Sequence, residues 1–324
     1  MNRHYQVITV GESTIDAFMT LPQGNDSILY DAEHSLLSFK HGDKIDVERY
    51  DFTIGGNATN VAVGLNRLGV KATLCSETGD DEFSIKIRNL LASEHVERLF
   101  VNQVHGASNF SVIINYRNER TVFVQNVERE HDFQLIDVTT DMVYLTSLGN
   151  KWQEPYKKIV AFARDQKACL VFNPGSRQIH EGRETVHYVL KYTDILILNK
   201  EEGEHLIYKK DIPDSPDNRE YIVELIGKLQ KLGAKTVVMT NGRHGSYAID
   251  EKKEIYYQEM YPGKLVERTG AGDAFSGGFL AAAVHGVCLP DSMLWGAINA
   301  SSVISHIGAQ AGLLKKDEMK EFLK

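Results

Sequence analysis

The sequence predicts an α/β fold in which a central, mainly parallel sheet is flanked by helices. Short apolar runs bounded by turn residues recur along the chain, and amphipathic helical stretches separate them. Buried strands that alternate with such helices are typical of a parallel sheet covered on both faces. In these folds, functional loops gather at the carboxyl ends of the strands, so the residues that follow each strand are the first site candidates.

The elements follow one another in a regular order. The expected strands span residues 6–10, 71–75, 142–146, 168–172, 195–198 and 236–239. The expected helices between them span residues 82–91, 155–167 and 221–232. Gly11, Asn173, Asn199 and Asn241 each lie just past the end of an expected strand, where a site would form.

Two regions interrupt this alternation. Residues 13–54 and about 106–127 contain few helical patterns and several half-apolar runs. In the second region, residues 111–115 and 121–124 have the pattern of two strands, and residues 116–120 would join them as a hairpin.

The segment 269–273 reads Thr-Gly-Ala-Gly-Asp and opens an apolar run that extends from 274 to 284. Gly270, Ala271 and Gly272 leave room for backbone N–H groups to converge on an anion, and the start of a helix adds further donors. Asp273 beside such an anion hole suits a general base that takes a proton from a hydroxyl during phosphoryl transfer. A glycine-rich turn followed by a helix with an aspartate in its first turn is the alternative interpretation.

A second glycine-centred segment lies upstream. Gly55, Gly56, Asn57 and Asn60 precede or open a short amphipathic helix that is expected to end near Gly69. Their neutral amides suit the hydroxyl groups of a polyol, whereas a phosphate or carboxylate substrate would call for Lys or Arg. An Asn-capped helix after a tight turn would also explain Asn57, but it explains Asn60 less well.

These two segments resemble the two signatures of the ribokinase-like (PfkB) carbohydrate kinases, and they stand in the family's order. Between them, the segment 199–202 resembles the family's Asn-x-x-Glu motif, and Thr240 to Gly245 resembles its nucleotide-side glycine loop. The resemblance extends from Gly11 to about Gly312. It implies one ribokinase-like domain over residues 1–324, with a small β-sheet lid formed by about 13–54 and 106–127.

The resemblance also assigns roles to individual residues. Asp273 would be the general base, with Gly270, Ala271 and Gly272 as the anion hole. The acceptor would be bound by Asp16, Gly55, Gly56, Asn57 and Asn60. The nucleotide side would comprise Asn199, Thr240, Gly242, Gly245 and Asn299, the last near the adenine. Glu202, with Asn199, would position Mg²⁺ through water. Asn173 and Arg177 also lie past a strand end and are weaker candidates.

Relatives of this kind use a lid to exclude water, which would otherwise compete as phosphoryl acceptor. The lid often joins two subunits, so the resemblance implies a homodimer. Many relatives read Asp-Thr-Thr before the anion hole, where this chain has Glu267, Arg268 and Thr269. That aspartate belongs to the monovalent-cation site of potassium-activated relatives, which puts potassium activation in doubt here. Arg268 would then place a fixed positive charge near the nucleotide.

Composition narrows the class of protein. The chain has 324 residues, 42% hydrophobic content and a formal net charge of −8, which argues against a general binder of nucleic acids or anionic membranes. Cys75, Cys169 and Cys288 are widely spaced in apolar contexts, as buried free thiols would be. The absence of an apolar signal core or a run of transmembrane length favours the cytoplasm.

These observations together predict an ATP-dependent, Mg²⁺-requiring kinase that phosphorylates a primary hydroxyl of a small sugar. Ribose is the first candidate and fructose the second. A nucleoside kinase of the same fold is an alternative, for which Phe18, Tyr30, Phe52 or Phe110 would supply an apolar base pocket. A sugar-binding regulator without catalysis is a further alternative, although it would have no use for Asp273.

Overall fold

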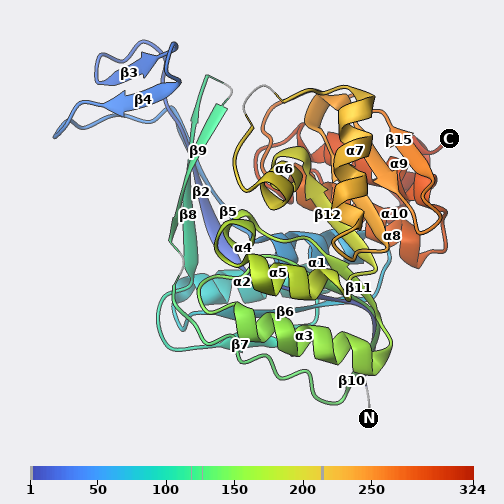
Figure 1. The fold of residues 1–324 in the computed structure, drawn as a ribbon. Helices are drawn as coiled ribbons and strands as arrows, with labels where there is room; N and C mark the ends of the chain where they lie inside the picture. The colour runs from blue at the N-terminus through green and yellow to red at the C-terminus, as the bar shows by residue number, and fades with distance from the viewer. Residues whose placement is uncertain (1–2, 118, 126, 213–214) are drawn as a thin grey trace.

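The computed structural model describes residues 3–117, 119–125, 127–212 and 215–324, and these residues form a central sheet with helices on both faces (Figure 1). Within them the sheet has nine strands in the order β15-β14-β13-β12-β11-β10-β1-β6-β7. The strand bounds are β1 Arg3–Val10, β6 Ala72–Thr78, β7 Val101–Gln103, β10 Val138–Leu145, β11 Cys169–Phe172, β12 Ile195–Asn199, β13 Thr236–Thr240, β14 Ser246–Ile249 and β15 Ile255–Gln258.

The predicted fold class is confirmed. The strands from β13 to β7 pair in parallel, and β14 and β15 add an antiparallel edge. The pattern did not predict this edge, because its two strands are only four residues long and a charged turn, residues 250–254, joins them instead of a helix. Such an antiparallel edge on a parallel sheet is common in large α/β folds.

Two sets of helices cover the sheet. One face carries α3 Gln153–Gln166, α4 Ser176–Glu181, α5 Arg183–Leu190, α6 Lys200–Tyr208 and α7 Arg219–Gln230. The other carries α1 Asn57–Arg67, α2 Glu82–Ser93, α8 Ala271–Val284, α9 Leu289–Val303 and α10 Lys316–Phe322. A short 3₁₀ helix, Gly242–His244, follows β13.

Alternation along each strand explains why the core has two layers. In β13, the side chains of Val237 and Met239 pack with the α3–α7 layer, whereas Val238 packs with the α1–α10 layer. All three are fully buried. Successive side chains of a strand point to opposite faces, so a strand covered on both faces must be apolar throughout. Packing of the two core layers therefore stabilises the sheet, and the positions of its strands determine where the loops at their carboxyl ends meet.

A separate four-stranded sheet, hereafter the small sheet, projects from the main body in the order β5-β2-β8-β9 (Figure 1). Its strands are β2 Thr14–Thr20, β5 Arg49–Gly55, β8 Asn109–Tyr116 and β9 Glu119–Gln125. Strands β8 and β9 pair antiparallel and include the predicted hairpin strands; Asn118, in the expected turn, lies outside the described residues. A two-stranded extension, β3 Ile28–Asp31 with β4 Leu36–Phe39, lies at the far end of the small sheet (Figure 1).

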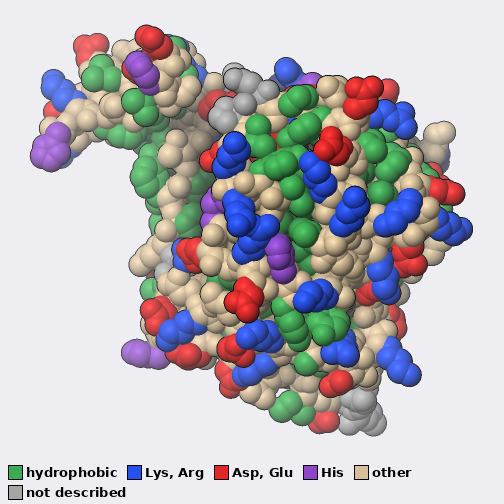
Figure 2. Space-filling view, viewed as in Figure 1, with side chains coloured by type: hydrophobic (Ala, Val, Ile, Leu, Met, Phe, Trp, Pro, Cys, Tyr) green, Lys and Arg blue, Asp and Glu red, His purple; other side chains and the backbone are tan. Residues whose placement is uncertain are grey.

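No helix among the described residues is both long enough and apolar enough to cross a membrane. The space-filling view shows acidic and basic side chains interspersed over the helical face that it presents (Figure 2).

Candidate active site

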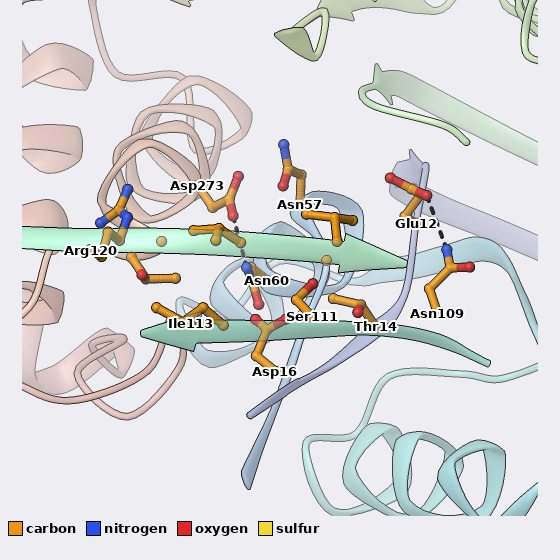
Figure 3. Close-up of a pocket in the computed structure, with 15 residues that line it drawn as sticks. Glu12, Thr14, Asp16, Asn57, Asn60, Asn109, Ser111, Ile113, Arg120 and Asp273 are labelled. Carbon is orange, nitrogen blue, oxygen red and sulfur yellow. Dashed lines mark hydrogen bonds between the residues drawn. The ribbon is translucent and has the colours of Figure 1, made fainter. Parts of the chain in front are cut away.

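Two cavities meet at the amino-terminal end of α8. The smaller cavity, of about 310 Å³, lies between the small sheet and the first turns of α1 and α8 (Figure 3). It is lined by Glu12, Thr14, Asp16, Gly56, Asn57, Asn60, Asn109, Ser111, Ile113, Arg120, Val122, Val124, Thr269, Gly270 and Asp273. The larger cavity, of about 880 Å³, lies on the other side of the same helix end, and Ala271 and Gly272 line it.

The turn before α8 requires its glycine. Gly270 caps the helix in the left-handed conformation, with φ of 79°, and a Cβ atom there would lie 2.4 Å from the Cβ of Ala309. Only glycine adopts this conformation without strain and allows such a close approach. The helix therefore begins with the N–H groups of its first turn between the two cavities, where an anion would be stabilised.

Asp273 lies in the first turn of α8 and faces the smaller cavity (Figure 3). Its Oδ2 accepts a 2.7 Å hydrogen bond from Nδ2 of Asn60, and Oδ1 of Asn60 accepts a 2.8 Å bond from Gln310. Burial raises the pKa of Asp273 to about 6, and the bond from Asn60 opposes this shift. The carboxylate is thus held in one orientation, and its pKa is tuned towards neutral pH as a general base requires.

Asp16 lies in β2 and lines the cavity, and the absence of a side chain at Gly55 leaves room for its carboxylate. A Cβ atom on Gly55 would lie 2.0 Å from Oδ2 of Asp16, so any side chain at residue 55 would displace the carboxylate. Burial is the main cause that raises the pKa of Asp16 to about 7; a hydrogen bond with Ser111 lowers it, and the charges of Asp273 and Glu267 raise it further.

Gly56 lines the cavity and also lets the loop at Glu12 pass close to the start of α1. Its φ is 95°, and a Cβ atom there would lie 2.3 Å from the backbone oxygen of Glu12. The predicted acceptor residues Asp16, Gly56, Asn57 and Asn60 are brought together with Asp273 around one cavity, while Gly55 lies behind Asp16.

Sequence reasoning missed several residues of the smaller cavity. Thr14, Asn109 and Ser111 line it from the small sheet, and Arg120 enters from the start of β9. Arg120 is the one arginine or lysine among the described residues that line this cavity. No local motif marks these residues, because they approach the cavity only through the pairing of β2 with β8 and of β8 with β9.

The larger cavity contains the predicted nucleotide-side loop. Thr240, Gly242 and Gly245 line it, and Gly245 has φ of 80° with the backbone oxygen of Gln258 only 2.3 Å from where a Cβ atom would lie. Basic side chains in its wall are Lys200, Arg243 and Arg268, and apolar ones include Phe275, Ala297 and Ile304. Basic groups beside an apolar wall suit a ligand with phosphates at one end and a flat ring at the other.

Asn199 and Glu202 form a capping box at the start of α6. Oδ1 of Asn199 accepts a 2.8 Å bond from the N–H of Glu202, and Oε2 of Glu202 accepts a 3.0 Å bond from the N–H of Asn199. Neither residue lines the two cavities. Burial raises the pKa of Glu202 to about 7, and the charges of Glu201 and Asp273 contribute to the rise.

Asn299 lies behind the larger cavity rather than in it. Its side chain is fully buried, donates a 2.7 Å bond to the backbone oxygen of Ala274, and accepts a 3.0 Å bond from the N–H of Leu314. Its neighbours Ala300 and Ser301 line the cavity instead. Asn299 therefore joins α8 to the segment that precedes α10, and its expected place near the adenine stays a prediction.

Asn173 and Arg177 are likewise held by protein groups. Asn173 joins the ends of neighbouring strands through the hydroxyl of Tyr144 at 3.1 Å and the backbone oxygen of Ile197 at 2.7 Å. Arg177 donates to the side chain of Asn150. Neither Asn173 nor Arg177 lines the two cavities.

Glu267 and Arg268 lie beside the anion-hole turn but contact different partners. The buried Oε1 of Glu267 accepts bonds from the N–H and the hydroxyl of Thr269, at 2.8 and 2.6 Å, and lies 3.3 Å from Nη1 of Arg120. Arg268 lies 3.6 Å from Glu119 and lines the larger cavity. The cation that contacts Glu267 is therefore Arg120 of the small sheet.

Comparisons with known proteins identify the family and the fold of the chain. The family model described as pfkB family carbohydrate kinase matches residues 24–316. The chain is 23% identical to an ATP-dependent 6-phosphofructokinase of Thermoanaerobacterium thermosaccharolyticum, over 98% of this chain and 94% of that one. It is 26% identical to a nucleoside kinase of Methanocaldococcus jannaschii, over 83% and 85%. The fold matches Arabidopsis thaliana ribokinase complexed with ribose and ATP at a TM-score of 0.80, with 19% identity and 99% of each chain covered.

Proposed function

The chain belongs to the pfkB family of carbohydrate kinases, and we propose that it transfers the γ-phosphoryl group of ATP to the primary hydroxyl of a small sugar. One observation carries the proposal: the first turn of α8 separates two cavities, with Asp273 facing one and Ala271 and Gly272 lining the other. A hydroxyl in the smaller cavity and a phosphate in the larger one would meet at this turn. The turn offers a base on one side and backbone donors on the other.

In the proposed reaction, Asp273 accepts the proton of the sugar hydroxyl as the oxygen attacks the γ-phosphorus. The N–H groups of Gly270, Ala271 and Gly272 stabilise the negative charge on the transferred phosphoryl oxygens. Asn60 keeps the Asp273 carboxylate oriented through its 2.7 Å bond. Its own orientation is fixed by Gln310, so the base, its positioning residue and the acceptor cavity form one connected unit.

Mg²⁺ bound to the nucleotide would shield the phosphate charges and favour attack by an oxygen nucleophile. Asn199 and Glu202 would belong to the outer coordination sphere of the ion. Their side chains bond to each other's backbone N–H groups in the capping box, so they would contact the ion through water and not directly. The electrostatic influence of Asp273 on the pKa of Glu202 supports this placement near the reacting groups.

Ribose is the first candidate acceptor and fructose the second. The cavity of about 310 Å³ offers carboxylate and amide groups to hydroxyls from Asp16, Asn57 and Asn60. Thr14 and Ser111 add hydroxyl groups from the small sheet.

A nucleoside acceptor has less support. None of Phe18, Tyr30, Phe52 and Phe110 lines this cavity among the described residues, although a base would need an apolar or aromatic platform. A silent sugar-binding regulator is disfavoured by the retained Asp273 and its glycines, since a pure binder gains nothing from a base beside an anion hole.

The test is ADP release with purified protein, ATP and Mg²⁺ against a panel of sugars, sugar phosphates, sugar acids and nucleosides. We expect the highest kcat/KM with a free pentose or hexose. A higher value with a nucleoside would contradict the acceptor assignment, and ATP hydrolysis or sugar binding without phosphoryl transfer would contradict the kinase assignment.

We further propose that the small sheet acts as a lid and joins two copies of the chain. Tyr50, Phe52 and Phe123 on its strands are 67%, 55% and 56% exposed, which is unusual for large apolar side chains. Sedimentation equilibrium would distinguish a dimer from a monomer. The double substitution of Tyr50 and Phe123 by Ser should shift a dimer towards monomer.

A further inference from the structure

Glu12 is a carboxylate of the smaller cavity that the proposed reaction does not use. It follows β1 and lines the cavity, yet it lies at the end away from Arg120, beyond Asn57 and Thr14 (Figure 3). The acceptor hydroxyl must lie near Asp273, so Glu12 faces the part of the acceptor that is remote from the transferred phosphoryl group.

The backbone of Glu12 is fixed by the start of α1. Its carbonyl oxygen accepts a 3.2 Å bond from the hydroxyl of Thr59, and the absence of a side chain at Gly56 allows the two segments to approach. The side chain also lies against Gly149, where a Cβ atom would be 3.5 Å from its Oε1, an ordinary contact distance. Glu12 is therefore held in place before any ligand binds, as a selective binding residue should be.

A chain of hydrogen bonds fixes the orientation of the carboxylate. Oδ1 of Asn109 accepts bonds from Nη1 of Arg129 at 2.7 Å and from the N–H of Val127 at 3.2 Å. An amide whose oxygen receives two donors must present its nitrogen on the other side, and Nδ2 of Asn109 donates a 3.0 Å bond to Oε1 of Glu12. Glu12 thus acts as an acceptor, and a carboxylate has further lone pairs for a ligand.

Burial raises the pKa of Glu12, and the positive charges of His131, Arg177 and Arg129 oppose this rise, although none of these three side chains lines the cavity. Arg129 is buried and directs Nη1 and Nη2 to Asn109 and to the backbone oxygen of Ala107. His131, also buried, lies 3.0 Å from Glu77. Among the described residues, neither Arg129 nor His131 lines the cavity, so a ligand at this end meets the carboxylate of Glu12 and the amide groups of Asn57 and Asn109.

We infer that Glu12 is a further acceptor-binding residue, which accepts a hydrogen bond from a hydroxyl at the end of the sugar remote from the phosphorylated oxygen. The acceptor accordingly carries free hydroxyls at that end, and an acidic group there is excluded by repulsion from Glu12. This inference rests on the proposed function and narrows its substrate class to uncharged sugars. Glu12 sets specificity, while Asp273 and the anion hole carry out the transfer.

The test compares Glu12→Gln with wild type on D-ribose and on two analogues that lack one remote hydroxyl, 2-deoxy-D-ribose and 1,4-anhydro-D-ribitol. We expect the variant to raise KM for ribose about 10-fold, which is the smallest effect usually caused by losing a hydrogen bond to a charged group. The kcat of the variant should stay within about twofold of the wild-type value. The rise should shrink to about twofold or less on the analogue that lacks the hydroxyl bound by Glu12. An equal rise on all three acceptors would show a merely structural role and overturn the inference.

An acidic probe tests the exclusion directly. α-D-Ribose 1-phosphate keeps the primary hydroxyl but carries a dianion at the remote end. We expect its kcat/KM with wild type to be at least 100-fold below that of ribose, and Glu12→Gln should narrow the gap. Comparable kcat/KM for the two acceptors would overturn the inference. If fructose is the better acceptor, 1-deoxy-D-fructose, 2,5-anhydro-D-mannitol and D-fructose 1-phosphate replace these probes.

Two controls separate the possible failures. Glu251→Gln, the same chemical change on an exposed turn, should leave every constant unchanged. The Tm of Glu12→Gln and its Kd for ATP report whether the fold survives. If the variant does not fold, Glu12→Asp replaces it, because this change moves the carboxylate back by one methylene. Glu12→Asp should then raise KM for ribose more than KM for the analogue that lacks the hydroxyl bound by Glu12. Lack of transfer to any compound of the panel would contradict the proposed function, whereas transfer that is indifferent to both variants would contradict this inference alone.

Discussion

At the scale of single residues, the chemistry depends on two carboxylates with different surroundings. Asp273 lies beside the helix start and is held by Asn60, whereas Asp16 lies in the small sheet and is held against Gly55. Burial raises the pKa of both, to about 6 for Asp273 and about 7 for Asp16. Perturbed carboxylates in a cavity indicate a functional site, and their positions support the proposed roles of Asp273 as the base and of Asp16 as an acceptor-binding group.

We predict that Asp273→Asn lowers kcat by about 10²- to 10⁴-fold, the usual cost of losing a general base. The amide keeps the size of the side chain and can still accept a bond from Asn60, so sugar and ATP should bind with nearly unchanged Kd. Stopped assays of ADP release and calorimetric titrations would measure the two effects. Asp165→Asn, an exposed change of the same kind, is the control. More than a tenth of wild-type kcat in Asp273→Asn would rule out this residue as the base.

The pH dependence of the reaction should have a distinct acid limb. The base must be deprotonated, so activity is present above the pKa of Asp273 and is lost as pH falls through about 6. Protonation of Asp16 near pH 7 should weaken the acceptor contact first. We therefore expect kcat/KM for the sugar to decline from about pH 7 and to fall steeply below 6. A flat kcat/KM down to pH 5 would contradict both assignments.

At the scale of elements, the junction between β5 and α1 shows how glycines set a site. Sequence patterns identified this junction and the start of α8, because glycines beside polar residues and an apolar helix leave a local signature. The pattern did not show why Gly55 is needed, since Asp16 approaches it only through the pairing of β2 with β5. Asn109 and Arg120 escaped prediction for the same reason, because they approach the cavity through the pairing of β8 with β2 and with β9.

We predict that Gly55→Ala weakens the acceptor site without harming the nucleotide site. The added Cβ atom would lie 2.0 Å from Oδ2 of Asp16, so the carboxylate must move and KM for the sugar should rise at least 10-fold. Gly227→Ala is the matched control, because a Cβ atom in that helix meets nothing within 4 Å and should slightly stabilise the protein. The measurements are KM for sugar, Kd for ATP and Tm. An unchanged KM for sugar in Gly55→Ala would refute the placement of Asp16.

At the scale of the whole molecule, contacts connect the small sheet with the anion-hole turn. Arg120 of β9 lies 3.3 Å from Glu267, and Glu119 lies 3.6 Å from Arg268. The sequence indicated that Glu267 and Arg268 depart from the Asp-Thr-Thr that many relatives have before the anion hole. It could not identify Arg120 as the partner of Glu267, because 147 positions separate them. Long-range ion pairs of this kind become visible only once the fold is assembled.

We predict that the kinase does not require potassium. Arg120 already supplies a positive charge to Glu267, and the same carboxylate accepts two bonds from Thr269. Replacing potassium by a large inert cation at constant ionic strength should change kcat by less than about twofold, since screening of the charged nucleotide then stays constant. In Arg120→Met, which removes the charge, activity should fall in either salt. Severalfold activation of the wild type by potassium alone would show that a cation site persists.

The shared helix start has a consequence for how such an enzyme can diversify. The proposed base and the proposed phosphoryl-binding amides belong to one turn of α8, so the distance between them is set by helical geometry. Much of the lining of the smaller cavity comes from the small sheet, which projects from the main body (Figure 1). Substitutions in the small sheet can therefore change which sugar the proposed site accepts, while the geometry of the first turn of α8 stays the same. Changes of substrate and conservation of the reaction would then concern different parts of the same chain.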